Sequence, residues 1–462
     1  MLCSNHKIAN MIDSINIKKY SIYFFRLGIF LLVSAPFISS LLFLVCIFYS
    51  ISEKGFQIIK DRWNYLFLVA SILMILVSTA HFLNYEYISF PLSKFREGKE
   101  IITIIDKESY SSFIGLANWI PLFFCFFGFQ SYLKTFNDRR IIIKLFVAGS
   151  VPFLISGFGQ LIFDWDGSLE LLNGLIIWFQ KSNGKFTGLF NNQNYAGCWL
   201  SIIWPFSISI FYEQTKNILK KSSSLIFIIT IGIASFLTFS RNAWGGLLIT
   251  IPLLFGSLSI CWILPVVFLF LILIFLNLSN FLPENLTTII EAALPAKFNI
   301  FEQIYKEFLP SSYPENADNR INIFIFGIKK ILNNPLLGWG AASFPIYYGL
   351  ENSIYKSHTH NLIIDTTFNY GLVISTIIFT NIFIICFLSF QKIILKSKKE
   401  NTHNLFERAW WTSFFVLLCS QMFDVQYYDL RISISFWILL AGLKCIIDEK
   451  ANKIPYTNRQ IS

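Results

Sequence analysis

The sequence predicts an all-α polytopic membrane protein, and three observations support this prediction. Of the 462 residues, 55% are hydrophobic, and the mean hydropathy is +0.58. Charged residues make up only 14% of the chain, well below the roughly 25% of ordinary soluble domains. Apolar runs of about 17–25 residues recur from end to end, and a helix of this length crosses a bilayer. A larger soluble segment has room only between about residues 283 and 357.

The apolar runs predict about twelve membrane helices with short polar connections. Residues 21–52 could form one helix, but Pro36, Ser39 and Ser40 favour a break into two. Residues 1–282 then hold nine helices, 283–360 a large loop, 361–447 three helices, and 448–462 a tail. The expected spans are 21–36, 38–52, 65–83, 113–133, 141–163, 195–212, 224–240, 243–259, 261–282, 361–390, 409–425 and 431–447.

The basic residues predict how these helices are oriented. Basic loops stay in the cytoplasm, and the basic segments are KTFNDRR (134–140), EQTKNILKK (213–221), QKIILKSKKE (391–400) and the tail. If residues 21–52 cross twice, both chain ends are cytoplasmic. The same rule explains the net charge of +10 without a nucleic-acid partner. The outer side then holds residues 84–112, 164–194, 240–242, 283–360 and 424–430.

The loop at 283–360 is longer than a connection requires, and long loops are often functional. Its second half is expected to be ordered. The stretch ADNRINIFIFGIKKILNNP has a capping residue in Asp318, apolar residues at helical spacing, and Pro335 as a stop. It predicts an amphipathic helix on the outer membrane surface, followed by the glycine-rich turn LLGWGAASF.

Four basic residues stand out near the membrane edge of the predicted outer side, where positive charge is unusual. Arg241 is the only charge in the tight turn TFSRNAWGG, and a guanidinium at this depth costs on the order of 2–3 kcal/mol unless it is paired. Lys185 precedes a span, Arg320 opens the surface helix, and Lys356 suits an interface anchor. Carboxylates within the spans are scarce, and Asp365 is the nearest one. We therefore expect an anionic ligand at this face, most simply a phosphate-bearing lipid.

The stretch KSHTHNLIIDTTFNYG (356–371) places two histidines before the next apolar run. A neutral imidazole accepts a proton near neutral pH, as a general base must. The helix start and the nearby cations should keep His360 neutral, and His358 is expected to be a bystander or to orient it. The His-x-His spacing could also bind a metal, but the sequence shows no third ligand at a useful spacing. A second, weaker metal candidate is the pair Asp164 and Asp166 in FDWDG.

Four motifs together resemble the O-antigen ligase and polymerase superfamily. They are GKFTGLFNNQNYAG (184–197), FSRNAWGGLL (239–248), NRINIFIFGIKKILNNPLLGWG (319–340) and HNLIIDTTFNYGLVI (360–374). The resemblance covers residues 180–375 by motif and the whole chain by its pattern of spans. Its most specific part is His360-Asn361 followed, after nine residues, by Gly371. The stretch FDVQYYDLRISISFW (423–437) is also similar to the closing region of that family.

This resemblance implies a metal-independent, inverting glycan transferase without a cofactor, on the periplasmic face of the inner membrane. Its donor would be a glycan on undecaprenyl diphosphate, and its acceptor would be a sugar hydroxyl of lipid A–core. By position, His360 matches the catalytic base of the family, and Arg241 and Arg320 match arginines that bind the donor diphosphate. Lys185 falls where a basic residue is usual. The residues expected to support the site are Asn194, His358, Asn361 and Gly371.

Three alternatives remain open at the level of sequence. A polymerase would join lipid-linked repeat units, and a protein O-oligosaccharyltransferase would modify proteins with the same donor. Three departures from the family pattern leave the subfamily open: Ile374 at a usually small or polar position, NNQN without the frequent proline, and Lys185 in place of a frequent arginine. A polysaccharide transporter would instead show internal repeats and ionisable residues near the membrane midplane, and the sequence shows neither clearly.

Overall fold

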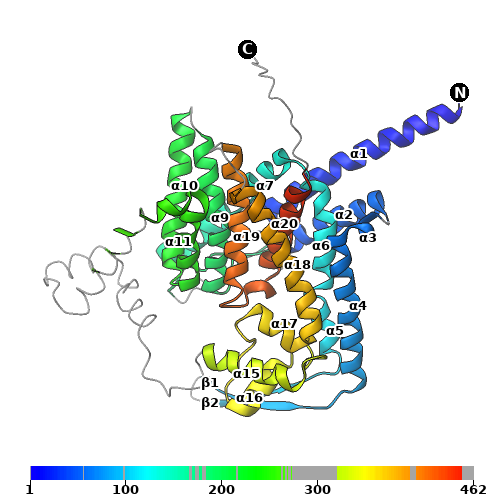
Figure 1. Cartoon of the computed structure of the whole chain (residues 1–462). Helices are drawn as coiled ribbons and strands as arrows, with labels where there is room; N and C mark the ends of the chain where they lie inside the picture. The colour runs from blue at the N-terminus through cyan, green and yellow to red at the C-terminus, as the bar shows by residue number, and fades with distance from the viewer. Residues whose placement is uncertain are drawn as a thin grey trace.

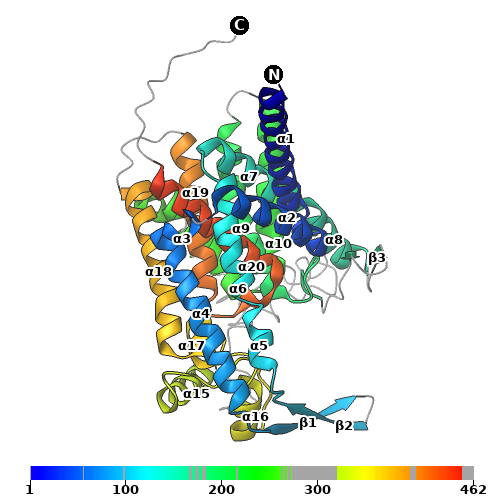
Figure 2. The same cartoon turned by 90° about the vertical axis from the view of Figure 1, so that its right-hand side faces the viewer.

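The computed structural model describes residues 2–55, 57–96, 99–165, 169–171, 176–178, 184–214, 217–261, 264–265, 268, 272, 320–395 and 402–449. These residues form a bundle of helices with two short β-hairpins (Figures 1 and 2). In this part of the chain, eight helical segments are long and apolar enough to cross a membrane. The protein is therefore a helical polytopic membrane protein, and the total of about twelve helices stays a prediction.

The first half of the chain follows the expected order of spans. The predicted break at Pro36 is confirmed, because this residue begins the second helix, where its fixed backbone angle suits the first turn. The helices are α1 (Leu2–Leu31), α2 (Pro36–Lys54), α3 (Gln57–Lys60), α4 (Arg62–Leu83), α5 (Ser111–Leu116), α6 (Ile120–Phe129), α7 (Phe136–Gly149) and α8 (Val151–Ile162). The spans expected at 113–133 and 141–163 are thus each made of two shorter helices.

The second half contains the segments that the motifs single out. The helices are α9 (Gln193–Glu213), α10 (Ile218–Leu237), α11 (Arg241–Phe255), α15 (Arg320–Asn333), α16 (Phe344–Asn352), α17 (Leu362–Tyr370), α18 (Leu372–Phe390), α19 (Thr402–Ser420) and α20 (Leu430–Asp448). The helix predicted before Pro335 is confirmed as α15. Most of the expected span 261–282 and the loop residues 283–319, including Asp318, lie outside the described residues.

The two hairpins lie in segments that the sequence predicts only as outer loops, at 84–112 and 164–194. Strand β1 (Ser89–Arg96) pairs antiparallel with β2 (Lys99–Asp106), and β3 (Leu169–Leu171) pairs with β4 (Ile176–Trp178). Strand β2 reads KEIITIID, and its β-branched isoleucine and threonine residues favour an extended backbone. The strands are therefore an addition to the predicted all-α fold.

The expected single span at 361–390 is wrong, because the helix breaks at Gly371. The φ angle of Gly371 is +86°, and a Cβ at this position would lie 2.0 Å from the carbonyl oxygen of Leu336. The turn before α16 packs into the break: Leu372 N donates to Pro335 O at 2.7 Å, and Trp339 N donates to Phe368 O at 2.7 Å. The break separates the short helix α17 from the long apolar helix α18.

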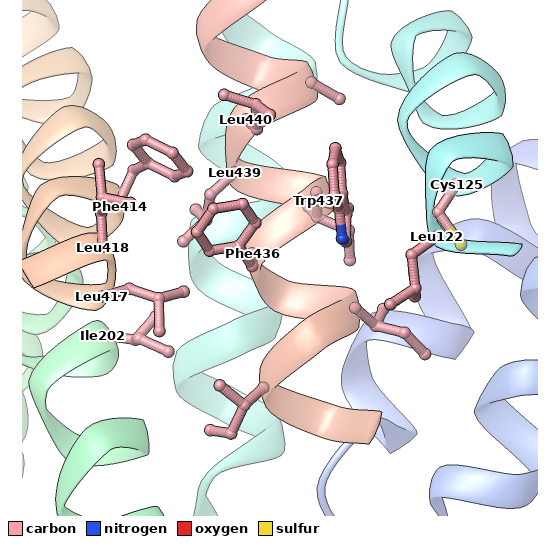
Figure 3. Close-up of a cluster of buried hydrophobic side chains, with 14 of the residues drawn as sticks. Leu122, Cys125, Ile202, Phe414, Leu417, Leu418, Phe436, Trp437, Leu439 and Leu440 are labelled. Atoms are coloured by element: carbon pink, nitrogen blue, oxygen red, sulfur yellow. The ribbon is translucent and has the colours of Figure 1, made fainter. Parts of the chain in front are cut away.

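Helix α20 lies at the centre of the bundle and is the most buried of the eight candidate spans. Figure 3 shows Phe436 and Trp437 of this helix between Phe414 of α19 on one side and Leu122 of α6 on the other. The indole Nε1 of Trp437 donates to the hydroxyl of Tyr427 at 2.8 Å. This packing fixes the start of α20 and the loop that precedes it.

The two ends of the bundle carry different structural elements. The start of α1 and the end of α20 lie at one end, and α15, α16, α17 and the β1–β2 hairpin lie at the other, which we call the hairpin end (Figures 1 and 2). Away from the hairpin end, the buried guanidinium of Arg139 contacts Glu407 at 2.9 Å and Glu449 at 2.6 Å. These ion pairs join α7 to α19 and to the end of α20.

Candidate active site

His360 lies at the hairpin end, directly before α17. Its φ angle is +57°, a conformation uncommon for any residue other than glycine. The next residue, Asn361, caps the helix, because its Oδ1 accepts hydrogen bonds from Ile363 N at 3.0 Å and Ile364 N at 3.1 Å. Its Nδ2 donates to the carbonyl oxygen of Met422 at 3.0 Å. The His-Asn pair therefore fixes the helix start and ties it to the loop between α19 and α20.

That loop brings a carboxylate to the histidine. The Nδ1 atom of His360 lies 2.8 Å from Oδ1 of Asp424. The other carboxylate oxygen of Asp424 accepts from Asn194 Nδ2 at 3.0 Å and from Gln426 Nε2 at 3.3 Å. Asp424 is only 6% exposed, so these bonds hold it in one orientation. Asn194, which the resemblance implies as a supporting residue, is thus hydrogen-bonded to the carboxylate that contacts His360.

The electrostatics of the pair determine which nitrogen of His360 carries the proton. Burial raises the pKa of Asp424, but the hydrogen bond and charge of His360, with His358 and Arg320 nearby, outweigh it and hold the pKa below its usual range. An ionised carboxylate only accepts hydrogen bonds, so Nδ1 of His360 must be the donor. In the neutral ring, Nε2 then keeps its lone pair free to accept a proton. The His360 side chain is 23% exposed, so a substrate can reach it.

His358 positions the same loop. Its Nδ1 accepts a hydrogen bond from the backbone N–H of His360 at 3.2 Å, and the two rings lie 4.5 Å apart in an edge-on arrangement. Burial lowers the pKa of His358; Asp365 opposes this shift, while His360 and Arg320 add to it. His358 is therefore neutral near pH 7 and acts as a hydrogen-bond acceptor that holds the backbone of His360.

The three side chains also form a possible metal-binding group. One ligand atom each of His358, His360 and Asp424 lies within 4.8 Å of the others. The prediction that His-x-His lacks a third ligand is thus wrong, because the fold brings in a residue 64 positions later in the chain. Each Nδ1 is already hydrogen-bonded, so a metal that bound through these atoms would have to break those bonds. For the pair Asp164 and Asp166, the second residue lies outside the described residues.

Two of the predicted cations, Arg320 and Arg241, each begin a helix. Arg320 begins α15 and acts electrostatically on both His358 and Asp424. Arg241 begins α11 and is exposed. The residue after Arg241, Asn242, donates from Nδ2 to Ser420 Oγ at 2.6 Å, and Ser420 ends α19 just before the loop of Asp424.

Lys185 lies near the same helix start. Its Nζ is 6.0 Å from the centre of the Phe239 ring, in the turn between α10 and α11. The start of α11, with Lys185 beside its turn, therefore meets the end of α19, from which the loop to Asp424 departs.

Two acidic residues have roles that sequence reasoning missed. The sequence prediction does not include Asp424, although it lies in FDVQYYDLRISISFW; the available signal is an acidic residue at the start of the expected outer loop 424–430. From the sequence, Asp365 is only the carboxylate nearest to the four basic residues of the predicted outer side. Its Oδ1 instead accepts from Thr359 N at 3.0 Å, and its Oδ2 accepts from Asn369 Nδ2 at 3.1 Å and from the hydroxyl of Tyr428. It therefore supports the backbone between the two histidines.

The fold and the site define a helical membrane protein with a histidine–carboxylate pair beside an arginine at one end of its bundle. Residues 225–379 match the protein family described as O-antigen ligase, and this match confirms the resemblance to the O-antigen ligase and polymerase superfamily. A comparison with curated proteins finds no match for the chain. The matched range includes Arg241, Arg320, His360 and Gly371, whereas Asp424 lies outside it. The family supports a membrane glycan enzyme of the O-antigen ligase or polymerase type.

Proposed function

We propose that this protein is an O-antigen ligase-like glycosyltransferase. It moves a glycan from undecaprenyl diphosphate to a hydroxyl of an acceptor of the lipid A–core type, on the periplasmic side of the inner membrane. The observation that supports this function best is the hydrogen-bonded pair of His360 and Asp424 within the electrostatic reach of Arg320. A base and a cation are the two groups that this transfer needs.

The reaction is a single displacement at the anomeric carbon. His360 Nε2 takes the proton of the acceptor hydroxyl while the new oxygen–carbon bond forms, and the bond from carbon to the diphosphate oxygen breaks. The electron pair leaves with undecaprenyl diphosphate, and the anomeric configuration inverts. General-base catalysis contributes about 10²–10⁴ in rate, and Asp424 stabilises the imidazolium that forms, as in other histidine–aspartate pairs.

Arg241, Arg320 and Lys185 stabilise the leaving diphosphate in this proposal. Fixed donors placed where charge develops are worth roughly 3–4 kcal/mol each. Arginine also offers two parallel donors that match phosphate oxygens. We propose the ligase before the polymerase because the matched family is described as O-antigen ligase. The two differ only in the acceptor, so the acceptor is the variable to test.

The test uses the purified full-length protein in lipid nanodiscs with an undecaprenyl-diphosphate-linked glycan. Separate reactions offer lipid A–core and a second lipid-linked repeat unit. We expect glycan transfer to lipid A–core, a new linkage of inverted configuration by NMR, and loss of transfer in His360→Ala. His403→Ala is the matched control, because His403 stacks on Phe136 away from the site. Transfer only to the repeat unit would identify a polymerase, and full activity of His360→Ala would refute the mechanism.

A further inference from the structure

A cavity of about 410 Å³ lies at the hairpin end, behind the histidine loop. Its walls come from the end of β2, from α5, from the turn before α16, from α17 and from the loop before α20. The volume falls within the range of about 300–1,000 Å³ typical of small-molecule sites. Carboxylates and amides line it together with aromatic rings, among them Asp106, Glu108, Asn118 and Trp119. The cavity therefore suits a ligand with many hydroxyl groups and some apolar faces.

Asp365 connects this cavity to the proposed active site. It lines the cavity, and its Oδ1 accepts the N–H of Thr359, which lies between the two histidines. Ser357 also lines the cavity. It is three residues before His360, and three residues of extended chain span at most about 11 Å. The cavity wall at Ser357 thus lies within about 11 Å of the backbone of the proposed base.

Tyr370 presents a polar group without a protein partner in this region. Its side chain lines the cavity and is only 2% exposed, and its hydroxyl has no hydrogen-bond partner among the described residues. The hydroxyl lies 2.7 Å from the point where a Cβ at Gly115 would stand, and Gly115 also lines the cavity. Burying a hydroxyl without a partner is costly. A ligand hydroxyl would supply the missing bond.

The charge of the lining restricts the chemistry of the ligand. Asp106, Glu108 and Asp365 are acidic, and none of the described lining residues is lysine, arginine or histidine. Lys107 lies between two of the acids in the sequence, but its Nζ donates to Trp339 O at 3.4 Å and lies 5.8 Å from the centre of the Tyr347 ring. Acidic sugars and phosphates would be repelled here, whereas the cations of the proposed diphosphate site belong to α11 and α15.

We propose that this cavity binds a neutral or amino sugar residue of the acceptor. Carboxylate and amide groups bind its hydroxyls, aromatic rings pack against its C–H faces, and the acidic lining rejects uronic acids and phosphorylated sugars. The assignment to the acceptor rests on the proposed function, because in that mechanism the acceptor hydroxyl is the group that contacts His360. The cavity then selects which acceptor sugar receives the glycan.

The direct test is binding without any donor. Saturation-transfer NMR on the full-length protein in nanodiscs compares three probes of equal size: maltose, a glucosamine disaccharide and a glucose–glucuronic acid disaccharide. We expect signals from the first two and none from the third. Tyr370→Phe removes only the unpartnered hydroxyl, so the fold should persist and maltose binding should weaken about fivefold, the effect of one hydrogen bond of about 1 kcal/mol. Glu108→Gln should admit the glucuronic acid probe.

A second test changes the wall of the cavity. Gly115→Ala would place a Cβ 2.2 Å from that of Ala341 and 2.7 Å from the Tyr370 hydroxyl, so α5 and the turn before α16 must shift around the cavity and probe binding should weaken. Gly232→Ala is the matched control, because its Cβ would meet only Trp204 at 3.6 Å. Equal binding of all three probes, or binding unchanged in both Tyr370→Phe and Gly115→Ala, would overturn the proposal.

Transfer assays separate this inference from the proposed function. His360→Ala should bind maltose as the unmodified protein does. Disaccharide binding by the unmodified protein without any glycan transfer would refute the function and leave the sugar site intact. Transfer with no disaccharide binding would refute only the sugar site. In the transfer assay, Tyr370→Phe should raise the KM of the acceptor and leave that of the donor unchanged. A rise in the donor KM alone would instead assign the cavity to the donor glycan and refute the acceptor assignment.

Discussion

The Nδ1 atom of His360 lies 2.8 Å from Oδ1 of Asp424, although 64 residues separate them in the chain. Two contacts set this distance. Asn361 Nδ2 donates to Met422 O, and Leu362 N donates to Gln421 O at 2.9 Å, so the start of α17 is fastened to the loop of Asp424. The proposed base therefore depends on two separate parts of the chain, and its activity should respond to changes in either.

Replacing Asp424 by asparagine should lower kcat by about 10²–10⁴. The amide has nearly the same shape, but it loses the charge that stabilises the imidazolium and fixes the proton on Nδ1. The donor KM should change little, because Asp424 contacts the histidine and not the diphosphate in the proposed mechanism. Steady-state kinetics in nanodiscs measures both constants. Asp448→Asn, at the opposite end beside Lys444, is the control, and an unchanged kcat in Asp424→Asn would contradict the role.

Replacing Arg241 or Arg320 by alanine should cost roughly 3–4 kcal/mol of transition-state stabilisation, about 10²–10³ in kcat/KM. Lysine at either position should recover only part of this loss, because it lacks the two parallel donors of arginine. Lys185→Ala should have a smaller effect. Kinetics with varied donor concentration measures the losses. Arg62→Ala, an exposed arginine at the start of α4 beside Trp63, should be neutral; a similar loss there would point to general destabilisation instead.

The stability of the protein should fall as the pH drops below about 6.5. The pKa of His358 in the folded chain is lower than its ordinary value of 6.5, so below that value the unfolded chain binds a proton that the folded chain does not. The loss continues down to the lowered pKa. Asp424 adds to it only at more acidic pH, since its own pKa lies below the ordinary value of 3.8. His358→Gln should therefore show a smaller decrease in Tm between about pH 7.5 and about pH 5.

Thermal unfolding in detergent, with buffers of equal ionic strength, measures this pH dependence. His403→Gln serves as the control, because His403 lies outside the site and should not change the slope. An equal decrease in Tm for the unmodified protein and for His358→Gln would exclude His358 as its source.

Much of the fold follows from composition and periodicity, and the exceptions have identifiable causes. Pro36 marks the α1–α2 break because it cannot donate a backbone hydrogen bond. The sequence does not predict the break at Gly371, because helix-compatible residues stand on both sides and only the left-handed backbone of that glycine interrupts the helix. Helix α11 has 15 residues, fewer than the span expected there. Its C-terminal end is set by Gly256, which caps the helix with a φ angle of +93°.

For the site, the sequence identifies candidate basic residues and histidines near the predicted outer side. It does not identify the residues that form hydrogen bonds with them. His360 and Arg320 were selected by their chemistry and by the resemblance. Asp424 could not be paired with His360 from the sequence, because that contact depends on how α17 packs against the end of α19. The same limitation applies to Asp365, whose hydrogen bond to Thr359 N is a local contact that no residue pattern indicates.

Turnover should not require a divalent metal, because the proposed base needs its ring nitrogen for the proton. Removing metals with a chelator should leave kcat unchanged. Added Zn²⁺ should inhibit instead, because His358, His360 and Asp424 offer ligand atoms within 4.8 Å of one another. His358→Gln should weaken this inhibition. Loss of turnover with the chelator and its recovery with Zn²⁺ would make these residues metal ligands and would refute the general-base mechanism.

Replacing Gly371 by alanine should destabilise the protein by about 2–4 kcal/mol. The φ angle of +86° is unfavourable for alanine, and the new Cβ would lie 2.0 Å from the carbonyl oxygen of Leu336. To relieve this overlap, the turn that is hydrogen-bonded to Leu372 and Phe368 must move. This movement would shift α17 together with His360, which stands directly before that helix. We expect a lower Tm together with reduced kcat. Gly232→Ala should change neither, and an unchanged Tm in Gly371→Ala would show that the helix break does not depend on glycine.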